Sequence, residues 1–281
     1  MDLREFVSPE QVEVGAKCLD YQPFILSDDV QTGVAYSFMH SQDPRVRPPL
    51  VFNRAEFEAD WDKAADSNQR LRAMYDDMLD FVAKKYPGGS LIDIACNNGY
   101  FPVGAERRGM KGFGLDLGSH YAKSVEFLNS VLGTDATFLN ASYDSRSHAF
   151  TADLPKCDVA VMSAIMCHIP DPLNFLSATT KLANKAFLFW GQVLDSDDNI
   201  VCYNPPHEEL SSLRDFPFSF NDNTRISRGM FKTSLNILGF DVIEEIGPHD
   251  TWLSLNGAVP WGLEEEFKKG SRHITFLASR S

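Results

Sequence analysis

Apolar residues change their spacing near residue 90 of this 281-residue chain. From Glu56 to Val82 they recur mostly at helical intervals until Pro87-Gly88-Gly89 ends the pattern, which predicts one or two amphipathic helices. Beyond this point, short apolar runs alternate with helical patterns, as in parallel βαβ units. The predicted strands are 90–94, 111–116, 135–139, 157–162, 185–190, 240–246 and 272–279, and the predicted helices are 102–109, 119–132, 172–183 and 228–238.

This order of elements predicts an α/β fold with a Rossmann-like, doubly wound sheet of seven strands. The sheet is expected to be mostly parallel, with an antiparallel last strand, because the connection 247–271 joins two closing strands without a further helix. Residues 1–55 are irregular and rich in Pro, Asp and Ser, and we interpret them as an N-terminal extension or cap. Residues 56–281 form the predicted main domain, with an inserted irregular segment at about 191–226.

Composition narrows the class of protein. No run of about eighteen apolar residues and no basic-then-apolar leader occurs, so we expect a cytoplasmic protein without a membrane span. The five cysteines are scattered and form no C-x-x-C pair, which argues against a disulfide framework and against a metal site. The formal charge of −13 disfavours nucleic acid as a partner and favours a small molecule. A homo-oligomer is left open.

Residues that directly follow the first two predicted strands are the first candidates for a ligand site, because ligands bind at the carboxyl ends of parallel strands. Small residues in LIDIACNNGYF (91–101) allow backbone amides to approach a ligand closely, and Gly99 can adopt a conformation that other residues avoid. Asp116 follows Asp93 at close to the spacing of about 20 residues at which an acid reaches a ribose hydroxyl. Together these features predict a nucleoside-containing ligand.

These stretches resemble the class I S-adenosylmethionine-dependent methyltransferases over roughly residues 85–281. LIDIACNNGYF stands where the family has an acid and a glycine-rich loop, and CDVAVMSAIMCHIPDP (157–172) is similar to the family's fourth strand. The resemblance implies that S-adenosylmethionine places its methionine at the first loop, its ribose on Asp116 and its adenine beside the third strand, and that the product is S-adenosylhomocysteine. The implied cofactor-binding residues are Asp93, Ala95, Cys96, Asn97, Gly99, Asp116, Leu117, Ala141, Ser142 and Ser163.

The loop keeps only one of the family's two or three glycines, with Ala95 and Asn97 at the other positions. Asn is among the few residues besides Gly that tolerate a left-handed backbone. We therefore expect the loop to keep its shape, provided that Asn97 is left-handed or otherwise permissive. Ser142 falls where the family usually has an acid beside adenine, which leaves the backbone of Ala141 as an alternative contact.

Residues beyond the fourth and fifth predicted strands are candidates for the acceptor side of the reaction. His168 could take a proton from an acceptor hydroxyl or amine near neutral pH, or could only position the turn that follows it. Trp190, Tyr203 and Arg225 are candidate substrate contacts around an acceptor lid, with core packing and a surface ion pair as the alternatives. The implied reaction is methyl transfer to an O, N, S or C atom of a small molecule.

Other motifs lead to different functions. GFGLDLG (112–118) lacks the helix-opening spacing of a dinucleotide fingerprint, and Asn204-Pro-Pro-His207 follows the wrong strand for an enzyme that methylates amino groups of bases or glutamine. FILSDDVQTG (24–33) and the segment from Arg225 to Phe240 are similar to the tRNA wobble-uridine carboxymethyltransferases, which keeps a tRNA-modifying enzyme open. The glycine-poor loop keeps open a non-catalytic cofactor-binding protein of the same fold.

Overall fold

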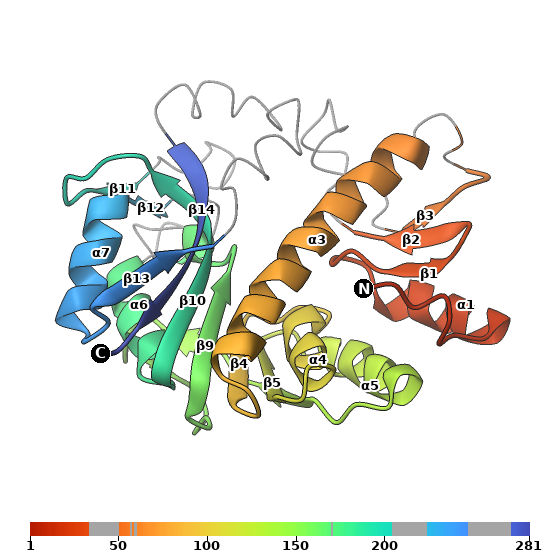
Figure 1. Cartoon of the computed structure of the whole chain (residues 1–281), viewed down its shortest axis with the longest axis horizontal. Helices are drawn as coiled ribbons and strands as arrows, with labels where there is room; N and C mark the ends of the chain where they lie inside the picture. The colour runs from red at the N-terminus through yellow and green to blue at the C-terminus, as the bar shows by residue number, and fades with distance from the viewer. Residues whose placement is uncertain (34–50, 57, 59–60, 170, 204–223, 247–270) are drawn as a thin grey trace.

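The computed structural model describes residues 1–33, 51–56, 58, 61–169, 171–203, 224–246 and 271–281. Its centre is a seven-stranded sheet in the order β13-β14-β10-β9-β4-β5-β6 (Figure 1). The strand bounds are β4 (Ser90–Ile94), β5 (Lys111–Asp116), β6 (Thr137–Asn140), β9 (Cys157–Ser163), β10 (Ala183–Leu194), β13 (Val242–Glu245) and β14 (Ser271–Ser279). Only β14 is antiparallel to its neighbours, β10 and β13. The predicted fold class is confirmed.

The middle strands form the centre of the sheet because they are apolar on both faces, as buried parallel strands are. One hydrophobic cluster includes Leu91, Val159 and Leu188, while their chain neighbours Ile92 and Ala160 belong to a second cluster. Successive side chains of a strand point to opposite faces, so each cluster marks one face of the sheet. The result is a helix–sheet–helix arrangement that leaves the carboxyl ends of β4, β5 and β9 at one edge.

Helices follow the strands in the predicted order. They are α4 (Tyr100–Glu106), α5 (Tyr121–Leu132), α6 (Pro172–Thr180) and α7 (Arg228–Ile237), with a short 3-10 helix, η1 (Met166–His168). Ser227 caps α7 by accepting a hydrogen bond from the Met230 amide at 3.1 Å. Gly133 ends α5 in a left-handed conformation, as a helix C-terminus favours.

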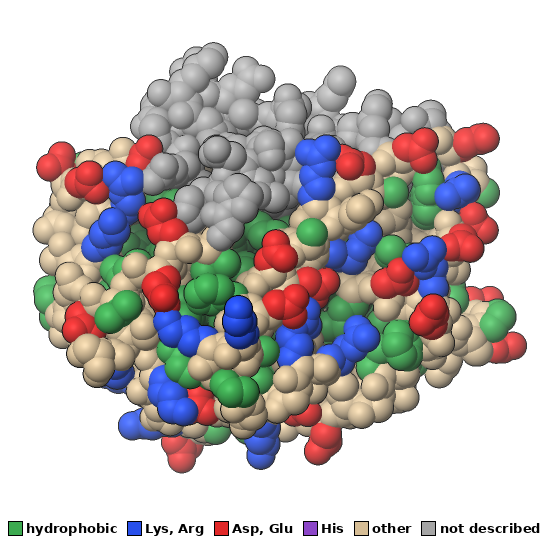
Figure 2. Space-filling model, viewed as in Figure 1, with side chains coloured by type: hydrophobic (Ala, Val, Ile, Leu, Met, Phe, Trp, Pro, Cys, Tyr) green, Lys and Arg blue, Asp and Glu red, His purple; other side chains and the backbone are tan. Residues whose placement is uncertain are grey.

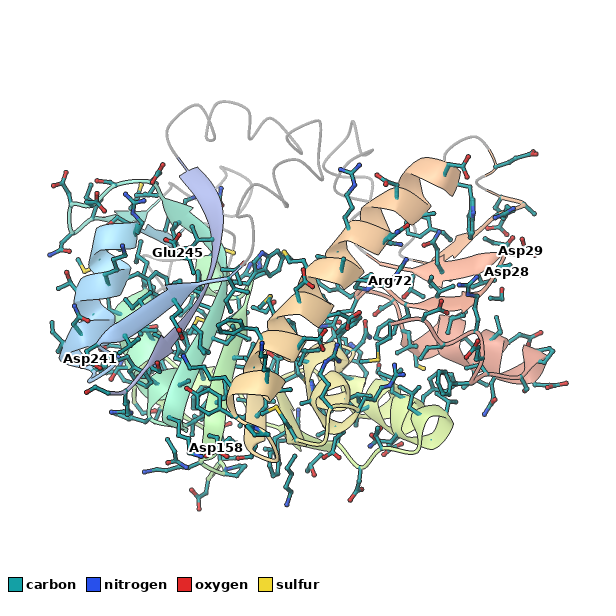
Figure 3. The ribbon with its side chains drawn as sticks, viewed as in Figure 1. Asp28, Asp29, Arg72, Asp158, Asp241 and Glu245 are labelled. Atoms are coloured by element: carbon teal, nitrogen blue, oxygen red, sulfur yellow. The ribbon has the colours of Figure 1, made fainter. Side chains whose placement is uncertain are left out.

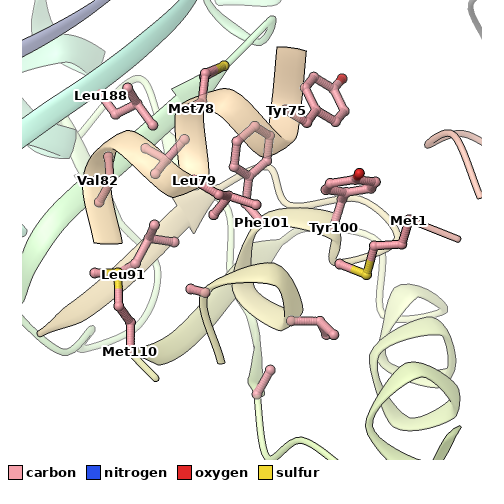
Figure 4. Packing of buried hydrophobic residues seen from close by; sticks show 14 of the residues in the cluster. Met1, Tyr75, Met78, Leu79, Val82, Leu91, Tyr100, Phe101, Met110 and Leu188 are labelled. Atoms are coloured by element: carbon pink, nitrogen blue, oxygen red, sulfur yellow. The ribbon is translucent and has the colours of Figure 1, made fainter. Parts of the chain in front are cut away.

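The helical pattern before the sheet forms one helix, α3 (Trp61–Lys85), which runs from the N-terminal region to the sheet (Figure 1). Its apolar face packs Tyr75, Leu79 and Val82 into the cluster that contains Leu91 and Phe101 (Figure 4). This helix therefore packs side chains from the segment just before β4 against that strand and against α4, which follows it.

The N-terminal region is more regular than the sequence interpretation allowed. It contains α1 (Pro9–Cys18) and a small antiparallel sheet of β1 (Ile25–Ser27), β2 (Val30–Thr32) and β3 (Val51–Asn53). Ser8 and Gln11 form a capping box, a start signal that was present in the sequence. The expectation of an irregular extension was therefore wrong for α1.

Glycines in β5 serve close packing and not dinucleotide binding. A Cβ atom at Gly112 would lie 2.0 Å from the Pro102 carbonyl oxygen, and one at Gly114 would lie 2.7 Å from Cys96 Sγ. These two positions therefore allow α4 and the loop after β4 to lie directly on β5. Close packing therefore explains the glycine spacing in β5 that superficially resembles a dinucleotide fingerprint.

Two small two-stranded sheets lie outside the central sheet. These are two antiparallel strand pairs, β7 (Tyr143–Asp144) with β8 (Ala149–Phe150), and β11 (Val201–Tyr203) with β12 (Thr224–Ile226). Basic and acidic side chains are interspersed over the face drawn in Figure 2. Among the described residues, no helix is long and apolar enough to cross a membrane, and no cluster of His, Cys, Asp and Glu fits a metal ion.

Candidate functional site

The loop after β4 has an unusual backbone. Ala95, Asn97 and Gly99 all have positive φ angles, of 63°, 52° and 89°. Asn97 therefore meets the left-handed condition that the sequence set for an intact loop. Left-handed conformations alternating with ordinary ones make a tight, curved turn, in which the amides of residues 96–99 hydrogen-bond within the protein. Non-glycine residues adopt this conformation at a cost of roughly 1–2 kcal/mol, so other contacts must hold the loop.

Asp116 provides two of these contacts from the end of β5, the strand paired with β4. Its Oδ2 accepts a hydrogen bond from the Asn97 amide at 3.0 Å, and its Oδ1 accepts one from the Gly118 amide at 2.9 Å. Each carboxylate oxygen has a second lone pair that can accept from a ligand hydroxyl. Asp116 thus shapes the loop and can bind a ligand with the same carboxylate.

The Asn97 side chain also fixes the loop. Its Nδ2 donates to the Tyr121 hydroxyl at 3.0 Å, and its Oδ1 accepts from the Asn98 amide at 2.8 Å. Burial raises the pKa of Tyr121 to about 12, so the phenol stays neutral at physiological pH. A glycine here would allow the same backbone without these two bonds.

Asp93 lies at the base of the loop and is 1% exposed. Its Oδ1 has no hydrogen-bond partner among the described residues. Burial, and then the nearby Asp116 charge, raise the pKa of Asp93 well above its ordinary value. An unpaired buried carboxyl is unfavourable, so this group fits a site where a ligand brings a donor or a positive charge.

We expect Asp93→Asn to stabilise the ligand-free protein by about 1–3 kcal/mol near pH 7. Because the pKa of Asp93 is raised by folding, the native state holds a proton that the unfolded chain releases above pH about 4. The free energy of unfolding therefore falls as pH rises from that value, and the variant lacks this loss. Urea unfolding of both proteins between pH 4 and 8 measures it, and parallel curves for the two would contradict the assignment.

Leu117 follows Asp116 and is 75% exposed, an unusual state for a leucine beside a buried strand end. Asn140 at the end of β6 supports this turn by donating from Nδ2 to the carbonyl oxygens of Asp116 and Leu117, each at 3.1 Å. The Ala141 amide donates to the Asp116 carbonyl oxygen at 3.1 Å, and the Ser142 amide donates to Thr151 Oγ1 at 3.0 Å. Both amides are therefore engaged within the protein, while Leu117 offers an apolar surface to a planar ring.

A family model described as a methyltransferase domain matches residues 66–245, more than half of the chain. The chain belongs to this methyltransferase family. The matched range runs from α3 to β13 and includes the loop after β4 and the end of β5.

Individual relatives are more distant. The ubiquinone biosynthesis O-methyltransferase of Hahella chejuensis is 23% identical over 118 residues, which cover 41% of this chain and 48% of that protein. This chain therefore spans about half the length of the curated relatives it matches. None of the relatives named here is a tRNA enzyme by its name, and the resemblance to the carboxymethyltransferases gains no support from them.

Solved structures share the fold. Magnesium protoporphyrin IX methyltransferase from Synechocystis PCC 6803 with bound SAH has a TM-score of 0.50 at 15% identity and covers 77% of this chain and 86% of its own. Coclaurine N-methyltransferase bound to N-methylheliamine and SAH has a TM-score of 0.51 at 10% identity, with coverage of 75% and 74%. At these identities the likeness supports the Rossmann-like architecture of this methyltransferase.

The other predicted cofactor residues divide into two groups. Ser163 lies at the end of β9, where it hydrogen-bonds with Tyr75 of α3. Cys96 is buried with its Sγ beside Gly114, so only its backbone faces the loop, and burial raises the pKa of its thiol. Tyr75 was missed by the sequence reading because its helical spacing marked it as a core residue.

The predicted acceptor residues of this methyltransferase lie in different environments. Trp190 is 4% exposed and makes an edge contact with Tyr75 at 5.7 Å between ring centroids, so it packs in the core. His168 is exposed in η1, and its amide donates to the Ile165 carbonyl oxygen at 3.0 Å. Arg225 is buried in β12, which pairs with the strand that carries Tyr203. Much of the predicted lid, residues 204–223 with the Asn-Pro-Pro-His stretch, lies outside the described residues.

Backbone strain gathers at this edge of the sheet. Among the described residues, four besides glycine have positive φ angles, namely Ala95, Asn97, His148 and Ala164. Ala95 and Asn97 follow β4, and Ala164 follows β9, where its amide donates to the Trp190 carbonyl oxygen at 2.7 Å. Strained backbone persists where surrounding contacts enforce it and is frequent at functional sites. The position of these strained residues therefore favours the carboxyl ends of β4 and β9 as the location of the functional site.

Proposed function

We propose that this protein transfers a methyl group from S-adenosylmethionine to an O, N, S or C atom of a small-molecule acceptor. The observation that carries the proposal is the left-handed loop 95–99 held against the carboxylate of Asp116. Membership of the methyltransferase family agrees with it. Asp116 and the buried Asp93 thus bring two carboxyls to the adjacent strand ends where a nucleoside bearing an amino acid would bind.

The described residues fit the methyl donor. Asp116 would accept from ribose hydroxyls with its remaining lone pairs, and the exposed Leu117 would cover one face of the adenine. The unpaired Oδ1 of Asp93 would hold the methionine portion, where the cofactor carries positive charge. When bound, S-adenosylmethionine supplies a methyl group activated by its sulfonium. The protein then contributes mainly alignment and exclusion of water, because an in-line displacement requires the acceptor atom to lie opposite the sulfur.

We assign the acceptor to the side formed by the ends of β9 and β10. His168 is the proposed base for an acceptor that must lose a proton, since it is exposed and an imidazole nitrogen can accept a proton. Tyr203 and Arg225 are the proposed acceptor contacts, and Trp190 supports the site through Tyr75. Small-molecule acceptors are favoured by the −13 charge of the chain and by the names of its relatives.

Isothermal titration calorimetry with S-adenosylmethionine and S-adenosylhomocysteine tests the proposed function. We expect both compounds to bind with dissociation constants in the micromolar range, near ordinary Michaelis constants of enzymes. Absence of binding by both at near-millimolar concentration would overturn the proposal. Binding of tRNA that weakens as the salt concentration rises, together with no binding of small acceptors, would instead favour the tRNA-modifying alternative.

A further inference from the structure

Asn98 lies in the middle of the loop after β4, residues 95–99, which we call the donor loop, but its side chain binds a different part of the chain. It is fully buried, and its Oδ1 accepts from the amides of Tyr21 and Gln22 at 2.9 and 3.1 Å. Its Nδ2 lies 3.1 Å from the Cys18 carbonyl oxygen and 3.2 Å from Asp20 Oδ1. One side chain therefore holds the whole turn that follows α1.

The side chain of Gln22 makes a second hydrogen bond, at the other end of the donor loop. Its Oε1 accepts from the Tyr100 amide at 2.8 Å, and Tyr100 is the first residue of α4. The N-cap residue of that helix, Gly99, has no side chain that can accept this hydrogen bond. First-turn amides of a helix have no partner within the helix, so Gln22 caps α4 from a distant segment.

A third contact joins the same turn to α5. The Ser124 hydroxyl donates to the Cys18 carbonyl oxygen at 2.6 Å, and Asn98 Nδ2 lies 3.2 Å from Ser124 Oγ. Residues 18–22 are thus bonded to the loop after β4, to the start of α4 and to α5. We call this turn, Cys18 to Gln22, the N-terminal clamp.

The clamp also lies beside groups of the proposed donor site. Asn98, which the clamp holds, is the chain neighbour of Asn97, whose Nδ2 donates to the Tyr121 hydroxyl. Loop residues on either side of Asn98 are left-handed, and an anchored side chain between them holds that geometry in place. We propose that the N-terminal clamp positions the methyl-donor loop, with Asn98 and Gln22 as positioning residues, an inference that rests on the proposed cofactor binding.

Gln22→Leu tests the clamp because it keeps the size of the side chain and removes the acceptor for the Tyr100 amide. Hydrogen exchange of the ligand-free protein is expected to be about tenfold faster in peptides spanning residues 95–104. The dissociation constant for S-adenosylmethionine, measured by calorimetry, is expected to rise about tenfold, the equivalent of one lost buried hydrogen bond. Gln22→Glu keeps an acceptor at a helix N-terminus and is expected to restore both values to near those of the wild type.

Gln31→Leu is the matched control. Gln31 is also a buried amide, but its Oε1 accepts from Asn68 Nδ2 at 3.2 Å, so its hydrogen bond joins β2 to α3 and not to the loop. We expect it to lower thermal stability without changing exchange in 95–104 or the affinity for S-adenosylmethionine. Ser124→Ala is a milder clamp variant, expected to weaken that affinity about threefold, and it tests the clamp even if Gln22→Leu fails to fold.

The possible outcomes separate the two proposals. Unchanged loop exchange in Gln22→Leu and Ser124→Ala, or an equal acceleration in Gln31→Leu, would overturn the clamp whatever the cofactor affinity. A wild-type protein that binds neither S-adenosylmethionine nor S-adenosylhomocysteine would overturn the proposed function. Faster exchange and weaker binding together, both reversed in Gln22→Glu, support the clamp as a part of the donor site.

Discussion

Asp116→Ala is expected to weaken the binding of S-adenosylmethionine and S-adenosylhomocysteine at least about a hundredfold. Charged hydrogen bonds to ribose hydroxyls contribute about 1.5–3 kcal/mol, and these are lost. The variant also leaves the amides of Asn97 and Gly118 without their acceptor, so the loop loses its shape in the free protein, and re-forming it on binding costs about 1–3 kcal/mol more. A total above about 3 kcal/mol corresponds to more than a hundredfold in affinity. Calorimetry with both compounds measures the change.

Asp158→Asn is the control for this prediction. Asp158 also accepts a backbone hydrogen bond, from the Ser90 amide at 2.9 Å, and it pairs with Lys185 at 2.9 Å. It lies at the opposite end of β4 and β9 from the donor loop (Figure 3). We expect Asp158→Asn to lower the melting temperature and to leave cofactor affinity unchanged. An equal loss of cofactor affinity in both variants would show that the effect of Asp116→Ala comes from a general loss of stability. Unchanged cofactor affinity in Asp116→Ala would contradict the assignment of Asp116 to the ribose.

The sequence predicted those parts of the site that depend on neighbouring strands. Adjacent parallel strands end at the same edge, so the spacing of Asp93 and Asp116 was enough to bring both carboxyls to one place. The left-handed backbone of Asn97 was also foreseeable, because few residues besides glycine tolerate it. These inferences follow from local rules that need no knowledge of distant contacts.

Long-range side-chain contacts were not predictable in this way. Asn98 and Gln22 are far apart in the chain, and no local pattern marks either of them as half of a hydrogen-bonded pair. Tyr75 and Trp190 carried the periodicity of core residues, and only the packing of α3 against β10 places the Tyr75 hydroxyl beside Ser163. Cys96 had the right position in the loop, but its side chain direction depends on the missing Cβ of Gly114. Tertiary packing therefore decided the lining of the site.

Asn97→Val and Asn97→Gly are expected to give opposite results, and the pair tests the conformation of the loop directly. Valine is branched at Cβ and strongly disfavours the φ of 52° found here, whereas glycine adopts it without strain. Valine also removes the bonds to the Tyr121 hydroxyl and the Asn98 amide. We expect Asn97→Val to lose about 2–4 kcal/mol of stability and to lose measurable binding of S-adenosylmethionine.

Asn97→Gly loses the same two side-chain bonds but keeps the backbone, so its affinity for S-adenosylmethionine is expected to stay within about fivefold of the wild type. Ala95→Gly relieves strain at φ 63° in the same loop and is expected to bind as the wild type does. Calorimetry and thermal unfolding of the three variants separate backbone shape from side-chain bonding. If Asn97→Val bound the cofactor as tightly as Asn97→Gly, the left-handed turn would not be what holds the methyl donor. If both bound poorly, the bond from Asn97 to Tyr121 would matter more than the backbone angle.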